Sequence, residues 1–229
     1  MRARVLVVLI VAATTFLAGC GGSSSSGSGR PRNGLEDLSA DEIAAKVTET
    51  MEGVSSFRFK GAAGKGSTTF QYDLQYAGSD VKGLVTANGM TFEVIVVDDA
   101  QYLRGSDDYW KSLLPDDKEA AILPQLSGKF VRRGDKPYDI IPKAKDIITI
   151  SGNLTKGEES TIKGTPVISI SDGERTLRAA LVGEPYLMES VTERGTVEFL
   201  DVNGGKTVSP PSDDSTVDLC ELDASICAS

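Results

Sequence analysis

The feature that most constrains the fold is a long stretch in which apolar and polar side chains alternate with a period of two. The alternation begins at Phe57 and continues to Leu103, interrupted by short turn sequences. One of these turns, Asn88-Gly89, is the strongest two-residue hairpin signal that a sequence can carry. A period of two is typical of strands with one apolar and one polar face. The pattern therefore predicts a meander of antiparallel strands joined by tight turns.

An amphipathic helix is predicted immediately before these strands. Ser39 and Glu42 have the spacing of a capping box, in which each side chain satisfies a backbone N–H of the other residue. Apolar residues then recur at helical spacing, at Ile43, Val47, Met51 and Val54. We expect the helix to end near Gly53.

The second half of the chain changes character twice. An irregular stretch is expected from residue 107, followed by a helix reaching Leu126 and by short helical turns between residues 137 and 148. Strand patterns then resume over residues 153–158, 165–171, 176–182, 186–193 and 196–200. The order of helix, strands, helices and strands favours a single α+β domain. Pro210-Pro211 is expected to close it.

The N-terminal residues are typical of a secretory signal. Arg2 and Arg4 precede an apolar run over residues 5–13, which is too short to cross a bilayer as a helix. The run ends in Leu17-Ala18-Gly19-Cys20, which resembles the lipobox of bacterial lipoproteins. That resemblance implies cleavage before Cys20 and a lipid on its thiol, which would anchor the protein to the extracytoplasmic face of the cell membrane. An ordinary signal peptide with a chance cysteine is the alternative.

These patterns divide the chain into four parts. Residues 1–19 are assigned to the signal peptide, and residues 20–37 to the lipidated cysteine and a Gly/Ser linker that is flexible by composition. Residues 38–211 form the predicted domain. Residues 212–229 form an acidic tail, in which Cys220 and Cys227 are an even pair of cysteines in an oxidising compartment, and we expect them to form a disulfide.

Composition excludes several functions. The chain has 33 acidic and 24 basic residues and a formal net charge of −9, so it lacks the basic stripe that nucleic-acid binding requires. It has no histidine, which excludes Ser-His-Asp and Cys-His catalysis and the HExxH zinc site. We expect no cofactor, no metal site and no catalytic residue.

Adjacent carboxylates leave one enzymatic alternative open. Four such pairs occur, at Asp98-Asp99, Asp107-Asp108, Asp116-Asp117 and Asp213-Asp214. Adjacent acids can perform acid–base chemistry where burial separates their pKa values, as in a carboxylate-dependent hydrolase. All four pairs fall at predicted turns or helix starts, where turn chemistry and the helix dipole account for them.

Two groups of residues are candidates for a binding site. An apolar strand face carries Tyr72, Leu74, Val85, Phe92, Val94 and Val96. These side chains form either ordinary core or the lining of a cavity, since one helix of about four turns and a few short ones offer limited cover for so long a sheet. Basic side chains at Lys129, Arg132 and Arg133 form either a solvated face or a contact for an anionic lipid headgroup.

Several segments together resemble the LprG/LppX/LprA/LprF lipoproteins of mycobacteria and other actinobacteria. The lipobox and linker carry the resemblance first. Further segments are the helix with Ile43 and Val47, the strands over residues 90–104 with Tyr109-Trp110, and residues 162–170, 183–187 and 195–199. Cys220, Cys227 and the acidic tail depart from the pattern of this family.

The resemblance implies a half-barrel of curved antiparallel strands wrapped over helices, with a hydrophobic cavity for acylated lipids or glycolipids. It also implies a distant likeness to the periplasmic carrier LolA, and no short catalytic motif. The predicted function is therefore lipid binding by a membrane-anchored lipoprotein, with transport to the cell envelope and an envelope transporter as a candidate partner. The alternative is a tethered accessory module with an ordinary core and a protein partner.

Overall fold

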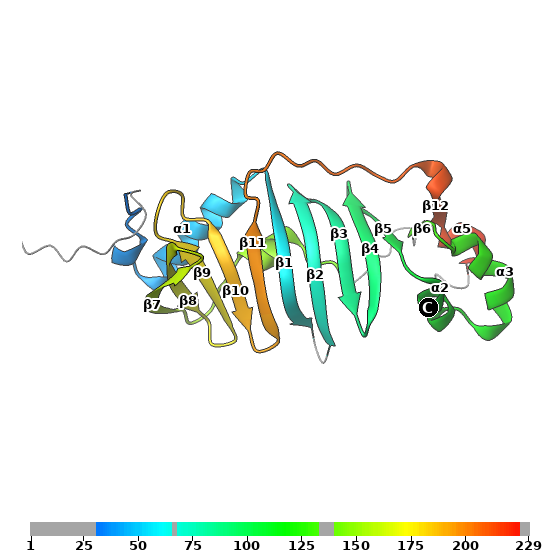
Figure 1. Cartoon of the computed structure of the whole chain (residues 1–229), viewed down its shortest axis with the longest axis horizontal. Helices are drawn as coiled ribbons and strands as arrows, with labels where there is room; N and C mark the ends of the chain where they lie inside the picture. The colour runs from blue at the N-terminus through cyan, green and yellow to red at the C-terminus, as the bar shows by residue number, and fades with distance from the viewer. Residues whose placement is uncertain (1–30, 66–67, 133–139, 225–229) are drawn as a thin grey trace, which may run out of the picture.

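The computed structural model of the protein describes residues 31–65, 68–132 and 140–224. These residues form an α+β fold built on one curved sheet of 12 strands (Figure 1). Within them, no helix combines the length and the apolar character that crossing a membrane requires.

The helices and strands have the following bounds. The helices are η1 (Leu35–Asp37), α1 (Ala40–Glu52), α2 (Asp107–Leu113), α3 (Asp116–Leu126), α4 (Ala144–Ile148), η2 (Asp213–Ser215) and α5 (Leu219–Leu222). The strands are β1 (Ser56–Lys65), β2 (Thr68–Ala77), β3 (Asp80–Ala87), β4 (Met90–Val97), β5 (Ala100–Arg104), β6 (Phe130–Arg132), β7 (Thr155–Ile162), β8 (Thr165–Ser171), β9 (Arg175–Ala180), β10 (Leu187–Thr192), β11 (Gly195–Leu200) and β12 (Thr216–Asp218).

The local predictions for α1 and the first meander are confirmed. Ser39 caps α1, its hydroxyl accepting from the Glu42 N–H while the Glu42 side chain accepts from the Ser39 N–H. β1 to β5 are consecutive antiparallel neighbours. Asn88 (φ +51°) and Gly89 (φ +78°) both adopt left-handed conformations at the β3–β4 turn. Such a turn matches the twist of the strands that it joins.

The two meanders form one sheet because β1 pairs with β11. The strand order is β12-β6-β5-β4-β3-β2-β1-β11-β10-β9-β8-β7, so the first strand of one meander lies beside the last strand of the other. Gly61 lies at this junction with φ +139°, and a Cβ there would lie 2.1 Å from the Thr196 carbonyl oxygen. Only glycine allows β1 and β11 to approach so closely.

The C-terminal segment differs from the expected tail. A connection that passes along the ends of the strands leads from β11 to β12 (Figure 1). β12 runs parallel to β6. The described sheet is therefore mixed: its two meanders are antiparallel, as predicted, and this one pair of strands is parallel. The short strand β12 and helix α5 extend the fold beyond Pro211, where the sequence pattern ended it.

Two further boundaries differ from the sequence-based expectations. Residues 107–113, expected to begin an irregular stretch, form α2, because the Ser106 hydroxyl accepts from the Tyr109 N–H and caps the helix. The fold also begins before Leu38. Arg32 bridges to Val182, Leu35 is 1% exposed, and both Nη atoms of Arg32 donate to the Glu159 carboxylate at 2.8 Å.

The two faces of the sheet have different surroundings. We call inner the face that carries Phe57, Phe59, Tyr72 and Tyr76, because these residues share one buried apolar cluster with α1 and α4. Figure 1 shows both helices on the same side of the sheet. The opposite face, here called outer, carries mainly polar and charged residues.

Candidate functional site

Two cavities lie on the inner face, on either side of residues 141–143, which we call the strap. The Tyr72 cavity has a volume of about 540 Å³, and the Val96 cavity has a volume of about 390 Å³. Both volumes fall in the range of small-molecule sites. The strap leads directly into α4, so the same short segment bounds both cavities.

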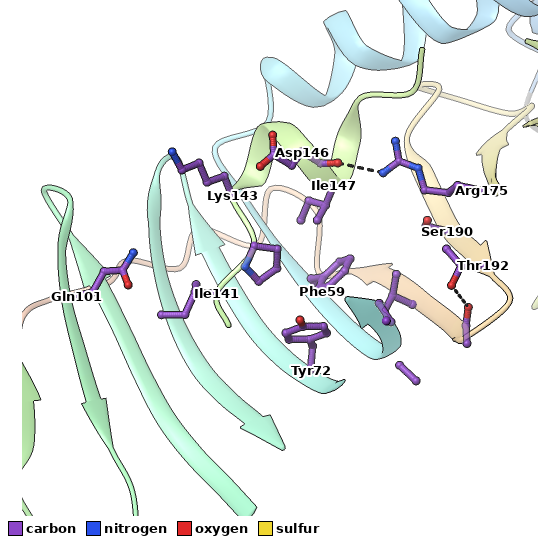
Figure 2. A pocket seen from close by; sticks show the side chains of 16 residues that line it. Phe59, Tyr72, Gln101, Ile141, Lys143, Asp146, Ile147, Arg175, Ser190 and Thr192 are labelled. Carbon is purple, nitrogen blue, oxygen red and sulfur yellow. Dashed lines mark hydrogen bonds between the residues drawn. The ribbon is translucent and has the colours of Figure 1, made fainter. Parts of the chain in front are cut away.

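The Tyr72 cavity combines an apolar floor with a polar rim. Phe59, Tyr72 and Val197 contribute from the strands. Figure 2 shows Ile147 of α4 on the side of Phe59 and Tyr72. Small residues widen one end, at Ala62, Ala63, Gly64 and Gly195. Polar side chains complete the lining, at Gln101, Lys143, Asp146, Arg175, Ser190 and Thr192.

Aromatic packing and burial fix the floor of this cavity. The Tyr72 ring lies 5.7 Å from the Phe59 ring and 5.8 Å from the Phe70 ring, measured between centroids. Burial raises the pKa of Tyr72 to about 12, because the phenolate would lose its hydration there. Tyr72 therefore presents a neutral ring and hydroxyl to the cavity at neutral pH.

Arg175 holds the far side of α4 to the sheet. Its guanidinium donates to the Asp146 carbonyl at 3.0 Å and to the Thr149 carbonyl, as the dashed line to α4 in Figure 2 illustrates. Burial lowers the pKa of Arg175, while Asp172 and Asp146 act in the opposite direction. Arg175 thus serves the wall of the Tyr72 cavity chiefly as a brace.

The Val96 cavity lies on the other side of the strap. Its apolar walls come from α1, the strands and α4, at Met51, Val54, Phe57, Val81, Val96 and Ile148. Charged side chains of both signs line it as well, at Glu52, Asp99, Lys143 and Lys145. Like the Tyr72 cavity, it offers an apolar wall beside a polar margin.

Tyr76 fastens the strap to the floor between the cavities. Its hydroxyl donates to the Pro142 carbonyl at 2.8 Å. The Tyr76 side chain is fully buried, and its ring stacks on Phe57 with centroids 4.8 Å apart. Burial, with a further contribution from Tyr72, raises the pKa of Tyr76. The hydroxyl therefore stays protonated and remains a donor to the strap.

The structure divides the six predicted lining residues. Tyr72 and Val96 lie on the walls of the two cavities. The other four are buried in the core and line neither cavity: Leu74, Val85, Phe92 and Val94. Phe92 packs against Tyr109 of α2 with ring centroids 4.4 Å apart. Helix α2 thus covers this part of the strand face. The sequence did not show which strand residues the helices would cover.

The predicted headgroup residues lie elsewhere. Lys129 donates to the Asp214 carbonyl, and Arg132 donates to Asp218 at 3.0 Å. Arg132 pairs in register with Tyr102, so it faces away from Gln101, which lines both cavities. Arg133 lies outside the described residues. A headgroup role for these three stays a prediction.

Lys143, Lys145 and Arg175 are the basic residues that do line the cavities. Lys143 and Lys145 follow Lys129 and Arg132 in the chain, and this local enrichment in basic residues was their one signal in the sequence. Nothing in the local pattern distinguishes Arg175, because its role depends on carbonyl groups that lie 26 and 29 residues away.

The remaining sequence-based sites lie in turns and short helices, or at the starts of helices, where they are described. The acidic pairs lie in the left-handed turn at Asp98-Asp99, in the first turns of α2 and α3, and in η2. Among the described residues, no group of three side chains is placed to hold a metal ion. Cys220 lies in α5 and takes part in a disulfide. Cys20 and Cys227 lie outside the described residues, so the lipid attachment and the pairing of Cys220 with Cys227 stay predictions.

Comparison with solved structures relates this fold to mycobacterial proteins. LprF from Mycobacterium bovis matches with a TM-score of 0.50 and 12% identity, over 76% of this chain and 97% of that one. The Mycobacterium tuberculosis lipoprotein LppX matches with a TM-score of 0.41 and 14% identity, over 74% and 99% of the two chains. No protein-family model and no curated protein matches the sequence. The similarity to LprF confirms the fold that the sequence resemblance implied.

Proposed function

We propose that the protein is a membrane-anchored extracytoplasmic lipoprotein that binds the acyl chains of a lipid or glycolipid, for transport to the cell envelope. The observation that carries this proposal is the pair of cavities between the apolar inner face and α4. The predicted lipobox and the shared fold with LprF support it. An envelope transporter would be the partner that supplies or receives the lipid.

Burial of methylene groups supplies the binding energy in this mechanism. Each methylene that leaves water contributes about 0.8 kcal/mol. A methylene takes up roughly the 30 Å³ of a water molecule in the liquid, so the cavity volumes correspond to about 18 and about 13 methylenes. Rings and aliphatic side chains provide the contact surface, while the polar margins leave a headgroup in water.

The anchor would keep the cavities close to the membrane. The contacts of the fold reach back to Arg32, so fewer residues separate them from Cys20 than the expected start at Leu38 would leave. A Gly/Ser-rich coil of roughly 12 residues has an average reach of about 20 Å. A lipid would then pass between the membrane and the protein over a short distance.

Extraction of bound lipid tests this function directly. The full chain carrying Cys20→Ser, which cannot be acylated at position 20, is purified under native conditions. Its organic extract is then analysed by mass spectrometry. We expect co-purified lipid at close to one molecule per protein, and a strong reduction in Ala63→Phe, which places a ring in the Tyr72 cavity.

Thr69→Phe is the matched control, since it adds the same ring on the exposed outer face of β2. It should keep its lipid. Lipid-free wild-type protein that crosslinks in membranes to one stoichiometric protein partner would instead establish the tethered interaction module.

A further inference from the structure

We propose that the two cavities form one bipartite site for a lipid with two acyl chains, one chain in each cavity, and with a headgroup phosphate at Lys143. This inference rests on the proposed function and specifies its ligand class. The argument begins with the walls that the cavities share. Four residues line both of them: Gln101, Ile141, Pro142 and Lys143.

Because they share these residues, the two cavities are adjacent and lie on opposite sides of the strap. Ile141 and Pro142 lie over the apolar floor but remain half-exposed, because each borders a cavity on either side. A single chain would have to cross the strap to use both spaces. Two chains that diverge from one headgroup would straddle the strap without displacing it.

The strap is fixed at the point where the chains would separate. Tyr76 holds its Pro142 carbonyl from below. The helix that follows is held on its other side by Arg175 and by the buried side chains of Ile147 and Ile148. Since both attachments come from the inner face, the strap that stands between the two volumes is part of the packed fold.

Lys143 is suited to meet the headgroup. Its side chain is exposed at the solvent end of the strap and lines both cavities. The other charged groups around the cavities are Glu52, Asp99, Lys145, Asp146 and Arg175. Arg175 is engaged with backbone carbonyls, and Lys145 borders the Val96 cavity alone. Lys143 is thus the cation that a phosphate between the two chains would reach, through a charge-assisted hydrogen bond.

Native mass spectrometry with two probes tests the number of chains. The delipidated Cys20→Ser chain is titrated with dipalmitoyl phosphatidylglycerol, which has two chains, and with palmitoyl lysophosphatidylglycerol, which has one. We expect one two-chain lipid per protein, or two one-chain lipids. Adding the two-chain lipid to the protein with both one-chain lipids bound should release both of them.

Two cavity-filling variants assign each chain to its compartment. Ala63→Phe fills the Tyr72 cavity and Val96→Trp fills the Val96 cavity. Each variant should bind one molecule of the one-chain lipid instead of two, and its affinity for the two-chain lipid should fall at least tenfold. Leu84→Trp, on the outer face where Leu84 is 47% exposed, is the control and should behave as wild type.

The outcomes separate this inference from the function on which it rests. If the protein binds only one molecule of the one-chain lipid, or if the two-chain lipid releases only one of two, the bipartite site is overturned. The proposed lipid-binding function is unaffected by either result. The displacement result uses the wild-type cavities alone, so it decides the question even where a filling variant misfolds. A wild-type chain that binds neither probe overturns the proposed function as well.

Lys143→Gln tests the headgroup contact. Because exposed ion pairs are weak, we expect affinity for dipalmitoyl phosphatidylglycerol to fall about two- to fivefold, with no change for dipalmitoylglycerol, which lacks the phosphate. Lys82→Gln is the matched control, since Lys82 is exposed next to Val81 and faces away from the cavity that Val81 lines. Unchanged affinity for the phosphate lipid, or an equal loss for both lipids, would remove Lys143 from the site.

Discussion

The inner and outer faces of the sheet are built from the same strands but are stabilised in different ways. On β1, Phe57 and Phe59 point inward and are 4% and 2% exposed. Arg58 and Lys60 alternate with them and bind Asp73 on β2, with Arg58 Nε at 2.6 Å and Lys60 Nζ at 3.1 Å from its carboxylate. Both cavities with apolar walls described above lie on the inner face.

The outer face continues this pattern across the sheet. Ion pairs connect neighbouring strands at Arg178–Glu189 and Arg104–Glu93, and a third ion pair connects Lys163 in the β7–β8 turn to Glu198 on β11. Partly exposed pairs of this kind contribute about 0–1 kcal/mol each. The comparison teaches that most of the stability, and both of the cavities described above, lie on one side of the sheet.

The largest expected effect comes from truncating matched leucines on the two faces. Leu74 is fully buried on the inner face, whereas Leu84 is 47% exposed on the outer face. We expect Leu74→Ala to lower the free energy of unfolding by about 2–5 kcal/mol, through lost burial and a cavity. Leu84→Ala should change it by less than about 0.5 kcal/mol. Urea unfolding measures both, and equal losses would contradict the asymmetry between the faces.

The next effect concerns the backbone where the two meanders join. Gly61→Ala would place its Cβ 2.1 Å from the Thr196 carbonyl oxygen, in a left-handed conformation. We expect a loss of about 1–3 kcal/mol in urea unfolding. Gly53→Ala is the control, since Gly53 has φ −79° and a Cβ there would be 3.5 Å from its nearest neighbour. An unchanged free energy of unfolding in Gly61→Ala would show that β1 and β11 can move apart without loss of stability.

A smaller effect is expected from the hydroxyl that holds the strap. Tyr76→Phe keeps the stacked ring but leaves the Pro142 carbonyl without its donor. We expect a loss of about 1–2 kcal/mol, because a buried acceptor loses its partner. Tyr102→Phe, on the half-exposed outer face, serves as the comparison and should be close to neutral. Equal unfolding midpoints for the two variants would argue that the strap is not fastened at Tyr76.

The smallest effect is a pH dependence on the outer face. The hydrogen bond from Arg58, with help from Lys60, lowers the pKa of the Asp73 carboxyl. Its contribution to stability is therefore present above the unfolded-state pKa of about 3.9 and is lost as the pH falls through the lowered folded-state value. Because these side chains are about a third exposed, Asp73→Asn should cost less than about 1 kcal/mol at pH 7.

Urea unfolding of wild type and Asp73→Asn between pH 2 and pH 7 measures this contribution. The difference between the two proteins should shrink toward pH 2. A constant difference would assign the loss to packing of the substituted side chain rather than to its charge.

Local sequence patterns predicted the parts of the fold that depend on neighbouring residues. The two residues of the Ser39–Glu42 capping box are three positions apart, and the Asn88-Gly89 turn sets the register of its own hairpin. In both cases the groups that interact are close in the chain. The resemblance to a known family supplied the curved sheet that these elements build.

The features that form the candidate site depend on distant contacts, which no local pattern contains. The bond from Tyr76 to the Pro142 carbonyl spans 66 residues, and the parallel pairing of β12 with β6 brings Asp218 to Arg132 across 86 residues. The basic run near Lys129 was therefore visible in the sequence, but its acidic partners were not. The alternation likewise identified the apolar face but could not show which part α2 would cover.

The two outermost strands of the described sheet have a further consequence. β7 carries Lys156, Glu158 and Glu159 and has an irregular register between Lys156 and Glu159, while β12 is three residues long and runs into α5. Charge, irregular pairing and shortness each make an edge a poor template for another chain. So wide a sheet can therefore remain monomeric at high local concentration, where a long flat border would promote aggregation.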